Sequence, residues 1–339
     1  MSLPYRTRQG LKRFFLVLLA ILVLAVAVWL CWLLWLSRYI IYTRDGAKLD
    51  FSLDAQVAVG EPALPPGEQE TVSIYYNEGE NVVETTTELK QLLGYYVELS
   101  QLREDPAAVI DQLRTLPAGT PVLVDVKNIY GSAYFSSSVV EPRSDQVEIA
   151  AMDELIQYLS RSGLYTIARL PALCDKNYGR NHVPSGIYHK SRGYLWMDSN
   201  GCYWLNPTKD DTVSYLMQQI NELKNLGFDE VVLSHFYVTD NQNIYFPDDK
   251  AQALAKAAQT LVTSCTTDTF AVSFVVDTVF APPEGRNRLY LMNAEAAQAA
   301  ALADSLTLDD PAIRAVFLTE FHDTRFEAYG VLRPLSTAE

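Results

Sequence analysis

The feature that most constrains this chain is an unbroken run of 23 residues without a charge, Phe14–Leu36. About 20 apolar residues, each rising 1.5 Å, cross a hydrocarbon core of ~30 Å, and a helix that is apolar on every face does not suit water. Trp29, Trp32 and Trp35 lie toward its C-terminal end, as aromatic side chains do at membrane interfaces. The run predicts one transmembrane helix.

The charges before this run predict its orientation. Residues 1–13 contain Arg6, Arg8, Lys12 and Arg13 and no acid, so we expect this basic segment in the cytoplasm and everything from residue 37 onward outside it. A cleaved signal peptide is the competing interpretation, but the run is long and no small-x-small site follows it. The sequence therefore predicts a signal anchor in the cell membrane, single-pass, with an extracytoplasmic C-terminal domain.

The net charge restricts the partners of that outer part. Beyond the four N-terminal cations, 23 basic and 41 acidic residues remain, a net charge of −18. Such a surface repels phosphate backbones, which argues against nucleic acid as a partner. It also argues against a second, basic membrane contact, so we expect membrane attachment through residues 14–36 alone.

Three cysteines lie in the outer part: Cys174, Cys202 and Cys265. They allow one disulfide at most. Cys174 and Cys202 flank one loop-like region and are the better pair, but three buried thiols are an equally open alternative.

The outer part divides at about residue 88. Residues 37–88 are polar and proline-rich without a helical period, which predicts an extracytoplasmic stalk. From residue 89 to 339, apolar runs alternate with amphipathic segments, and one helix should begin at Pro106 with Asp105 as its N-cap. The predicted strands cover 94–99, 121–126, 165–170, 230–234, 270–276 and 312–318, and the other helices cover 153–162, 211–226, 250–263 and 294–305.

This alternation predicts an α/β fold with a parallel sheet covered by helices. About 250 residues in one such array favour a (β/α) TIM-type barrel over a doubly wound sheet. Only six strands are recognisable, which leaves an incomplete or irregular barrel open.

Four stretches between residues 94 and 277 carry a family resemblance. They are Val124-Asp125-Val126-Lys127-Asn128 with Gly131 and Tyr134; Gly163-Leu164-Tyr165-Thr166-Ile167-Ala168-Arg169; Gly193-Tyr194-Leu195-Trp196 with Trp204-Leu205-Asn206-Pro207; and Leu226-Gly227-Phe228-Asp229-Glu230. In this order they resemble the bacterial putative glycosyl hydrolase domain, a family once catalogued as a domain of unknown function. The resemblance implies a TIM barrel related to α-amylase-type glycosidases.

One position departs from that family. Where the family has a strand ending in Phe-Asp-Tyr-Ile-Arg-Phe-Pro, this chain has Leu233-Ser234-His235-Phe236-Tyr237-Val238-Thr239. The resemblance implies a nucleophilic Asp at the place of Ser234 and an Arg at the place of Tyr237. A hydroxyl cannot replace a carboxylate that forms a glycosyl intermediate, so we expect impaired catalysis.

Other carboxylates follow the predicted strands, where TIM-barrel chemistry gathers. The candidates for catalysis are Asp125, Asp277 and Glu320. Asp125 and Lys127 share one strand face by alternation and form a candidate polar pair at the barrel opening. The competing interpretation is a structural ion-pair network of both with Arg169.

The loop from 172 to 210 is rich in aromatic residues beside hydrogen-bonding groups, a combination that sugar rings bind. A self-packed lid is the alternative. The candidate substrate-binding residues are Lys127, Arg169, Tyr194, Trp196, Trp204, Ser234, His235 and Tyr237.

No histidine lies in a metal-binding spacing, and no nucleotide-binding motif is present, so the sequence predicts neither a metal nor a cofactor. Two functions remain. One is a pseudoenzyme that binds polysaccharide or cell-wall glycan in the cell envelope; the other is an active glycoside hydrolase that uses Asp125, Asp277 or Glu320.

Overall fold

The computed structural model describes residues 40–43, 46–49, 88–191, 193–276 and 281–338. The chain divides into two units, 1–81 and 82–339, which we describe separately. Within the described part of the first unit, β1 (Ile40–Thr43) and β2 (Gly46–Leu49) pair antiparallel, with Ile40 opposite Leu49. The predicted membrane helix and most of the predicted stalk lie outside the described residues. None of the described helices is long and apolar enough to span a bilayer.

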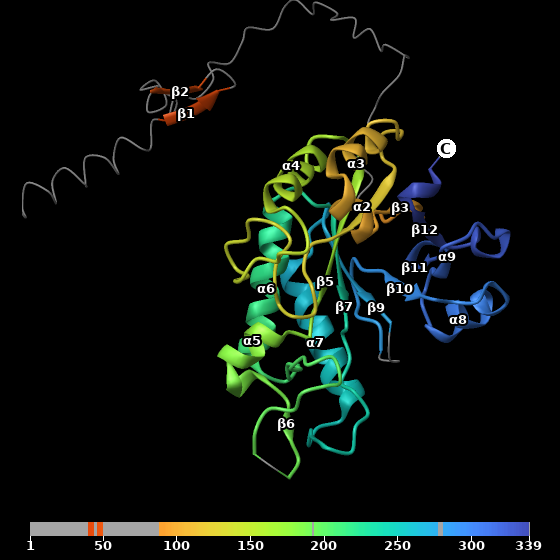
Figure 1. The fold of residues 1–339 in the computed structure, drawn as a ribbon. Coiled ribbons are helices and arrows are strands. Elements are labelled where there is room, and N and C mark those ends of the chain that lie inside the picture. Colours follow the sequence, from red (N-terminus) through yellow and green to blue (C-terminus); the bar gives the residue numbers. More distant parts are fainter. Residues whose placement is uncertain (1–39, 44–45, 50–87, 192, 277–280, 339) are drawn as a thin grey trace, which may run out of the picture. The chain divides into compact units, whose positions relative to one another are not determined.

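The second unit is a closed barrel of eight parallel strands in sequential order (Figure 1). The strands are β3 (Leu93–Tyr96), β4 (Pro121–Asp125), β5 (Tyr165–Pro171), β7 (Glu230–Ser234), β9 (Ala271–Val275), β10 (Leu289–Met292), β11 (Ala315–Leu318) and β12 (Gly330–Pro334). β12 pairs with β3 and closes the ring. The predicted barrel is confirmed, and it is complete, because β10 and β12 supplement the six strands recognised in the sequence.

Long helices cover only part of the barrel. α3 (Pro106–Leu113), α4 (Ile149–Leu159), α6 (Asp210–Asn225) and α7 (Lys250–Cys265) belong to the first half, and Figure 1 shows α6 and α7 beside β5, β7 and β9. The other described helices are short: α2 (Leu99–Glu104), α5 (Lys176–Asn181), α8 (Ala299–Ser305) and α9 (Pro311–Arg314). Short 3-10 turns cover Val183–Ser185, Ala296–Gln298, Thr324–Phe326 and Leu335–Thr337.

Local sequence explains where several elements begin. Asp105 accepts a hydrogen bond from the Ala108 amide (3.0 Å) and Pro106 is the first residue of α3, as predicted. The first strand ends at Tyr96 rather than at residue 99, because Glu98 and Gln101 form a capping box that starts α2 at Leu99. The predicted strand at 312–318 begins only at Ala315, since Pro311 opens α9.

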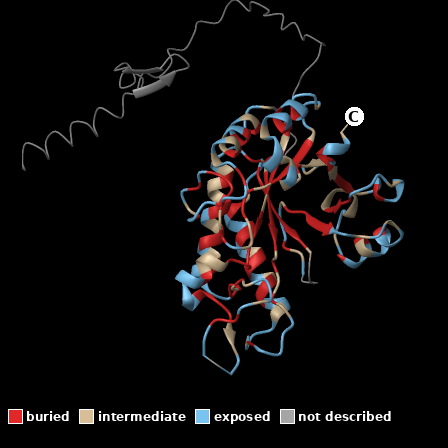
Figure 2. Ribbon diagram, viewed as in Figure 1, coloured by how far each residue is buried: buried red, intermediate tan, exposed pale blue. Residues whose placement is uncertain are grey.

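Two apolar layers follow from the alternation of side chains along the strands. Leu123, Ile167, Val232 and Tyr290 belong to a cluster inside the barrel, whereas their neighbours in sequence pack outward against the helices. Figure 2 shows that the strands are buried along most of their length. Polar residues two positions before or after these interior residues on the same strand therefore also face the barrel axis.

At the N-terminal end of the barrel, Glu230 lies fully buried in a polar network. It forms an ion pair with Arg288 and accepts hydrogen bonds from Tyr165 (2.9 Å), Ser273 (2.5 Å) and Tyr290 (2.9 Å). These residues come from four different strands or their edges. The network therefore links β5, β7, β9 and β10 inside the barrel. In TIM barrels the N-terminal ends of the strands contribute to stability, and the C-terminal ends carry the active site.

Candidate functional site

The candidate site lies at the barrel mouth, which we define as the C-terminal ends of the strands. Asp125 ends β4, Arg169 lies near the end of β5 and Ser234 ends β7. Each is two residues beyond an interior residue (Leu123, Ile167 and Val232), so all three face the barrel axis at the same end.

Asp125 and Arg169 form a bidentate ion pair between the neighbouring strands β4 and β5. Arg169 Nε donates to Asp125 Oδ1 at 2.6 Å, and Nη2 donates to Oδ2 at 2.9 Å. Burial alone would lower the pKa of Arg169, but the charge of Asp125 and these hydrogen bonds outweigh it and raise that pKa. Both oxygens of Asp125 are therefore engaged by a permanent cation.

Lys127 does not join this pair. β4 ends at Asp125, so Lys127 no longer follows the alternation of the strand. Its Nζ atom lies 2.8 Å from Asp175 Oδ2 in a buried ion pair. Gln219 and Tyr215 complete the group through hydrogen bonds of 2.9 Å to Lys127 and 3.0 Å to Asp175. This pair ties the ends of β4 and β5 to α6, away from the Asp125–Arg169 pair.

Further charges surround the mouth. Burial, followed by the charges of Glu98 and Glu320, raises the pKa of Tyr96, while Arg169 acts in the opposite direction. Burial and the charge of Asp125 raise the pKa of Tyr134 to about 12. Glu320 itself is exposed, just beyond β11, and Asp277, the third catalytic candidate, lies outside the described residues.

Ser234 is 8% exposed, and its Oγ lies 3.3 Å from Nδ1 of the adjacent His235. His235 has φ of +51°, a conformation that breaks the strand alternation and lets the two neighbouring side chains meet. Alternation along a strand predicts the opposite, so sequence reasoning missed this contact.

Aromatic rings pack beside Ser234. The ring centroid of Trp204 lies 4.6 Å from that of Tyr237 and 6.3 Å from that of His235. Trp204 and Trp196 are buried, whereas Tyr194 is 48% exposed and Tyr237 and His235 are half-buried. The loop therefore packs its two tryptophans as its own core, and Tyr194, His235 and Tyr237 keep accessible surface.

The loops after β5 and β7 meet beyond the mouth. β6 (Tyr188–His189) from the first loop, labelled toward the bottom of Figure 1, pairs antiparallel with β8 (Ile244–Tyr245) from the second. Two residues near the mouth were not among the predicted site residues: Tyr96, and Met292, whose Sδ lies 3.6 Å from Arg169 Nη1. Tyr96 could have been predicted, because alternation along the predicted strand 94–99 puts it on the same face as Glu98. Met292 could not, because the sequence analysis did not recognise its strand.

Comparison with family models places residues 102–272 in the putative glycosyl hydrolase domain family. The match covers just over half of the chain. The chain belongs to this family. The matched segment includes the Asp125–Arg169 pair and Ser234, and no curated protein matches the chain in sequence.

Three solved structures align with parts of this family member at low sequence identity. A GH36 α-galactosidase, AgaA, from Geobacillus stearothermophilus in complex with raffinose is 9% identical with a TM-score of 0.50, over 75% of this chain and 40% of its own. A hypothetical protein from Ruminiclostridium thermocellum is 16% identical with a TM-score of 0.45, over 53% of this chain and 96% of its own. The glycoside hydrolase domain of PelA from Pseudomonas aeruginosa is 10% identical with a TM-score of 0.42, and the alignment covers 73% of this chain and 95% of that domain's chain.

Proposed function

We propose that this protein is a membrane-anchored, extracytoplasmic glycoside hydrolase-like protein that binds envelope or extracellular polysaccharide and has impaired catalysis. Family membership supports the hydrolase-like domain. The apolar run at 14–36 and the basic residues before it support the anchor and its orientation.

The observation that carries impaired catalysis is Ser234 at the end of β7, facing the barrel axis. A retaining glycosidase needs a carboxylate nucleophile and a second carboxyl group ≈ 5–5.5 Å away, and an inverting one needs a carboxylate that activates water. A serine hydroxyl supplies neither. Asp125 is a poor replacement, because Arg169 holds both of its oxygens.

Sugar binding rests on the accessible groups around Ser234. Tyr237 and His235 offer half-buried ring surface, and the Arg169 side chain, 16% exposed, offers N–H donors at the same mouth. Apolar ring faces stack against the C–H faces of sugars while nearby donors bind hydroxyl groups. Trp204 packs against the Tyr237 ring and is itself too buried to stack on a ligand.

The test combines binding and turnover measurements on the purified full chain against a panel of α- and β-linked polysaccharides. We expect binding without turnover, and roughly tenfold weaker binding in Tyr237→Ala, since an aromatic contact is worth about 0.5–1.5 kcal/mol beyond the area that it buries. Tyr158→Ala is the matched control, because Tyr158 is also half-buried but lies on α4 outside the barrel. Equal binding by both variants, or no binding to any glycan, would contradict the proposal.

An active glycoside hydrolase is the second candidate, supported by the carboxylates Glu98 and Glu320 that act on Tyr96 at the mouth. If the protein is an active hydrolase, the turnover assay should show robust activity that persists in Ser234→Ala and disappears in Asp125→Asn or Glu320→Gln. Binding measurements on the same variants would separate lost chemistry from lost binding.

A further inference from the structure

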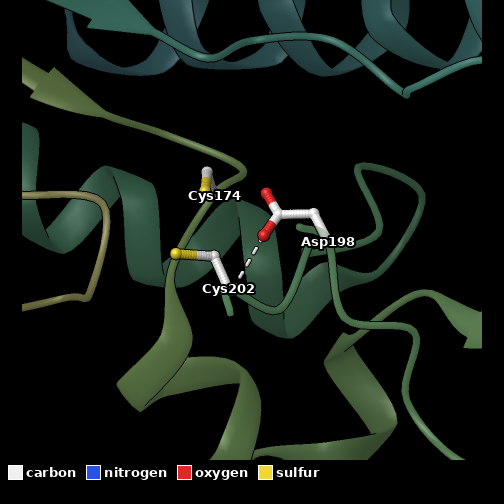
Figure 3. A group of neighbouring side chains, drawn as sticks. All are labelled: Cys174, Asp198 and Cys202. Atoms are coloured by element: carbon white, nitrogen blue, oxygen red, sulfur yellow. Dashed lines mark hydrogen bonds between the residues drawn. The ribbon is translucent and has the colours of Figure 1, made fainter. Parts of the chain in front are cut away.

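Three potential metal ligands meet within the aromatic-rich loop 172–210 (Figure 3). Cys174 lies just after β5, and Asp198 and Cys202 come from the loop between β6 and α6. One ligand atom from each, the two Sγ atoms and a carboxylate oxygen, all lie within 4.8 Å of one another. The cysteines are 1% and 0% exposed, and Asp198 is half-buried.

The backbone around them sets the spacing of the two sulfur atoms. Leu205 N donates to Leu173 O (2.7 Å) and Asp175 N donates to Tyr203 O (3.0 Å), which places Cys174 opposite Trp204 and makes Cys202 its diagonal neighbour. Diagonal Cα atoms in antiparallel pairs are typically about 7–8 Å apart, more than a relaxed disulfide spans. A tetrahedral ion with bonds of about 2.3 Å instead holds two sulfur atoms about 3.8 Å apart.

Asp198 is held in place by hydrogen bonds and keeps acceptor capacity. Its Oδ1 accepts from the amides of Asn200 and Cys202, both at 2.9 Å, and its Oδ2 accepts from Trp204 Nε1 at 2.9 Å. With a single hydrogen bond of this kind, Oδ2 retains a lone pair for a cation. Ligating carboxylates are commonly oriented in this way by surrounding donors.

We propose that Cys174, Cys202 and Asp198 bind a divalent metal ion of the zinc class, with water as the fourth ligand. Two thiolates favour zinc over the hard ions calcium and magnesium, and three protein ligands plus water make a four-coordinate ion. A divalent cation also offsets the cost of burying two thiolates beside a carboxylate. The ion joins the end of β5 to the loop that carries Trp204, and this role is independent of whether the barrel hydrolyses or binds glycans.

The test measures zinc and cobalt binding by the purified full chain under reducing conditions. We expect one equivalent of Zn²⁺ by elemental analysis, and with Co²⁺ a near-ultraviolet thiolate charge-transfer band with strong visible bands. Cys174→Ser and Cys202→Ser should each abolish stoichiometric binding, and Asp198→Asn should weaken it by about tenfold or more. Cys265→Ala is the control, because this third buried cysteine lies at the end of α7 and should leave binding unchanged.

A second measurement keeps the proposal testable if a variant fails to fold. All three cysteines are buried and react only when the structure opens locally, so the unaltered protein is alkylated in mild denaturant. Zn²⁺ should then slow alkylation of Cys174 and Cys202 without slowing that of Cys265, as read by mass spectrometry of peptides. Absence of bound Zn²⁺ and of this protection would overturn the proposal. So would a quantitative Cys174–Cys202 disulfide, two hydrogen atoms lighter and without metal, in protein purified without reductant.

Discussion

Ser234 offers a hydroxyl where the family resemblance predicts a carboxylate. His235 Nδ1 lies 3.3 Å from its Oγ, and the side chain is largely buried. Asp125, the acid that ends β4 at the same mouth, is bound to Arg169. Substitution at position 234 therefore tests directly whether a missing carboxylate limits catalysis.

We predict that Ser234→Asp gains hydrolysis that is at least about tenfold above Ser234→Asn, because glycoside hydrolysis needs two carboxyl groups and general acid–base catalysis alone contributes about 10²–10⁴-fold. Ser234→Asn is the matched control of similar size without the charge. Release of reducing sugar from the glycan that the protein binds is the measurement. Equal rates in the two variants would mean that no second carboxyl group at the mouth can act together with a carboxylate at position 234.

Residue-level prediction succeeded where strand alternation persisted and failed where it stopped. Alternation persists along β4 and β5 as far as Asp125 and Arg169, which face the barrel axis. It failed for Lys127, because β4 ends at Asp125, and for His235, whose positive φ reverses its direction. The family resemblance, rather than periodicity, singled out Ser234. The position of Asp175 just beyond a predicted strand was recognisable, but its pairing with Lys127 was not, because a tertiary contact across 48 residues leaves no local pattern.

At the scale of elements, β3 and β4 approach so closely that one position requires glycine. A Cβ on Gly94 would lie 2.1 Å from the carbonyl oxygen of Pro121, in the backbone of the neighbouring strand. Backbone cannot move aside as a flexible side chain can. The β3–β4 pairing therefore depends on Gly94.

We predict that Gly94→Ala lowers the free energy of unfolding by about 3 kcal/mol, as overpacking of a rigid wall does. Gly119→Ala is the comparison: its Cβ meets nothing within 4 Å, but its φ of +80° costs about 1 kcal/mol. Chemical denaturation of both variants is the measurement. Equal losses would show that the two strands can move apart at this point for only about 1 kcal/mol.

Six of the eight strands were predictable because each is a run of apolar residues with helical segments around it. β10 is only four residues long, Leu289–Met292, and β12 contains Gly330 and Pro334, residue types that are depleted in strands generally. Both are strands because the closed ring supplies partners on either side. Barrel closure is a tertiary property that no local window contains.

At the scale of the whole molecule, the family match at 102–272 is smaller than the barrel. It leaves out β3, β10, β11 and β12, which complete the ring, and it ends inside β9. A fragment limited to the matched residues would expose open sheet edges and is unsuited to expression. Experiments on the domain need all residues from β3 to β12.

The anchor and orientation are also tested on the whole molecule. We predict that protease added to intact protoplasts removes the domain after residue 37 and leaves a short protected N-terminal fragment, because the basic residues 1–13 favour the cytoplasmic side. Immunoblotting with an N-terminal tag is the measurement, and permeabilised cells are the control. Full protection of the domain in intact protoplasts would reverse the orientation.

The buried Glu230–Arg288 pair has a consequence for synthesis on the ribosome. The two residues are 58 positions apart, so at about 5–20 residues per second Arg288 is made roughly 3–12 s after Glu230. Until then, burial of the Glu230 carboxylate lacks its cation and is unfavourable. We therefore expect the nascent first half of the barrel to stay open and hydrated around Glu230 until Arg288 is made, and the ring can close only after β12 has been translated.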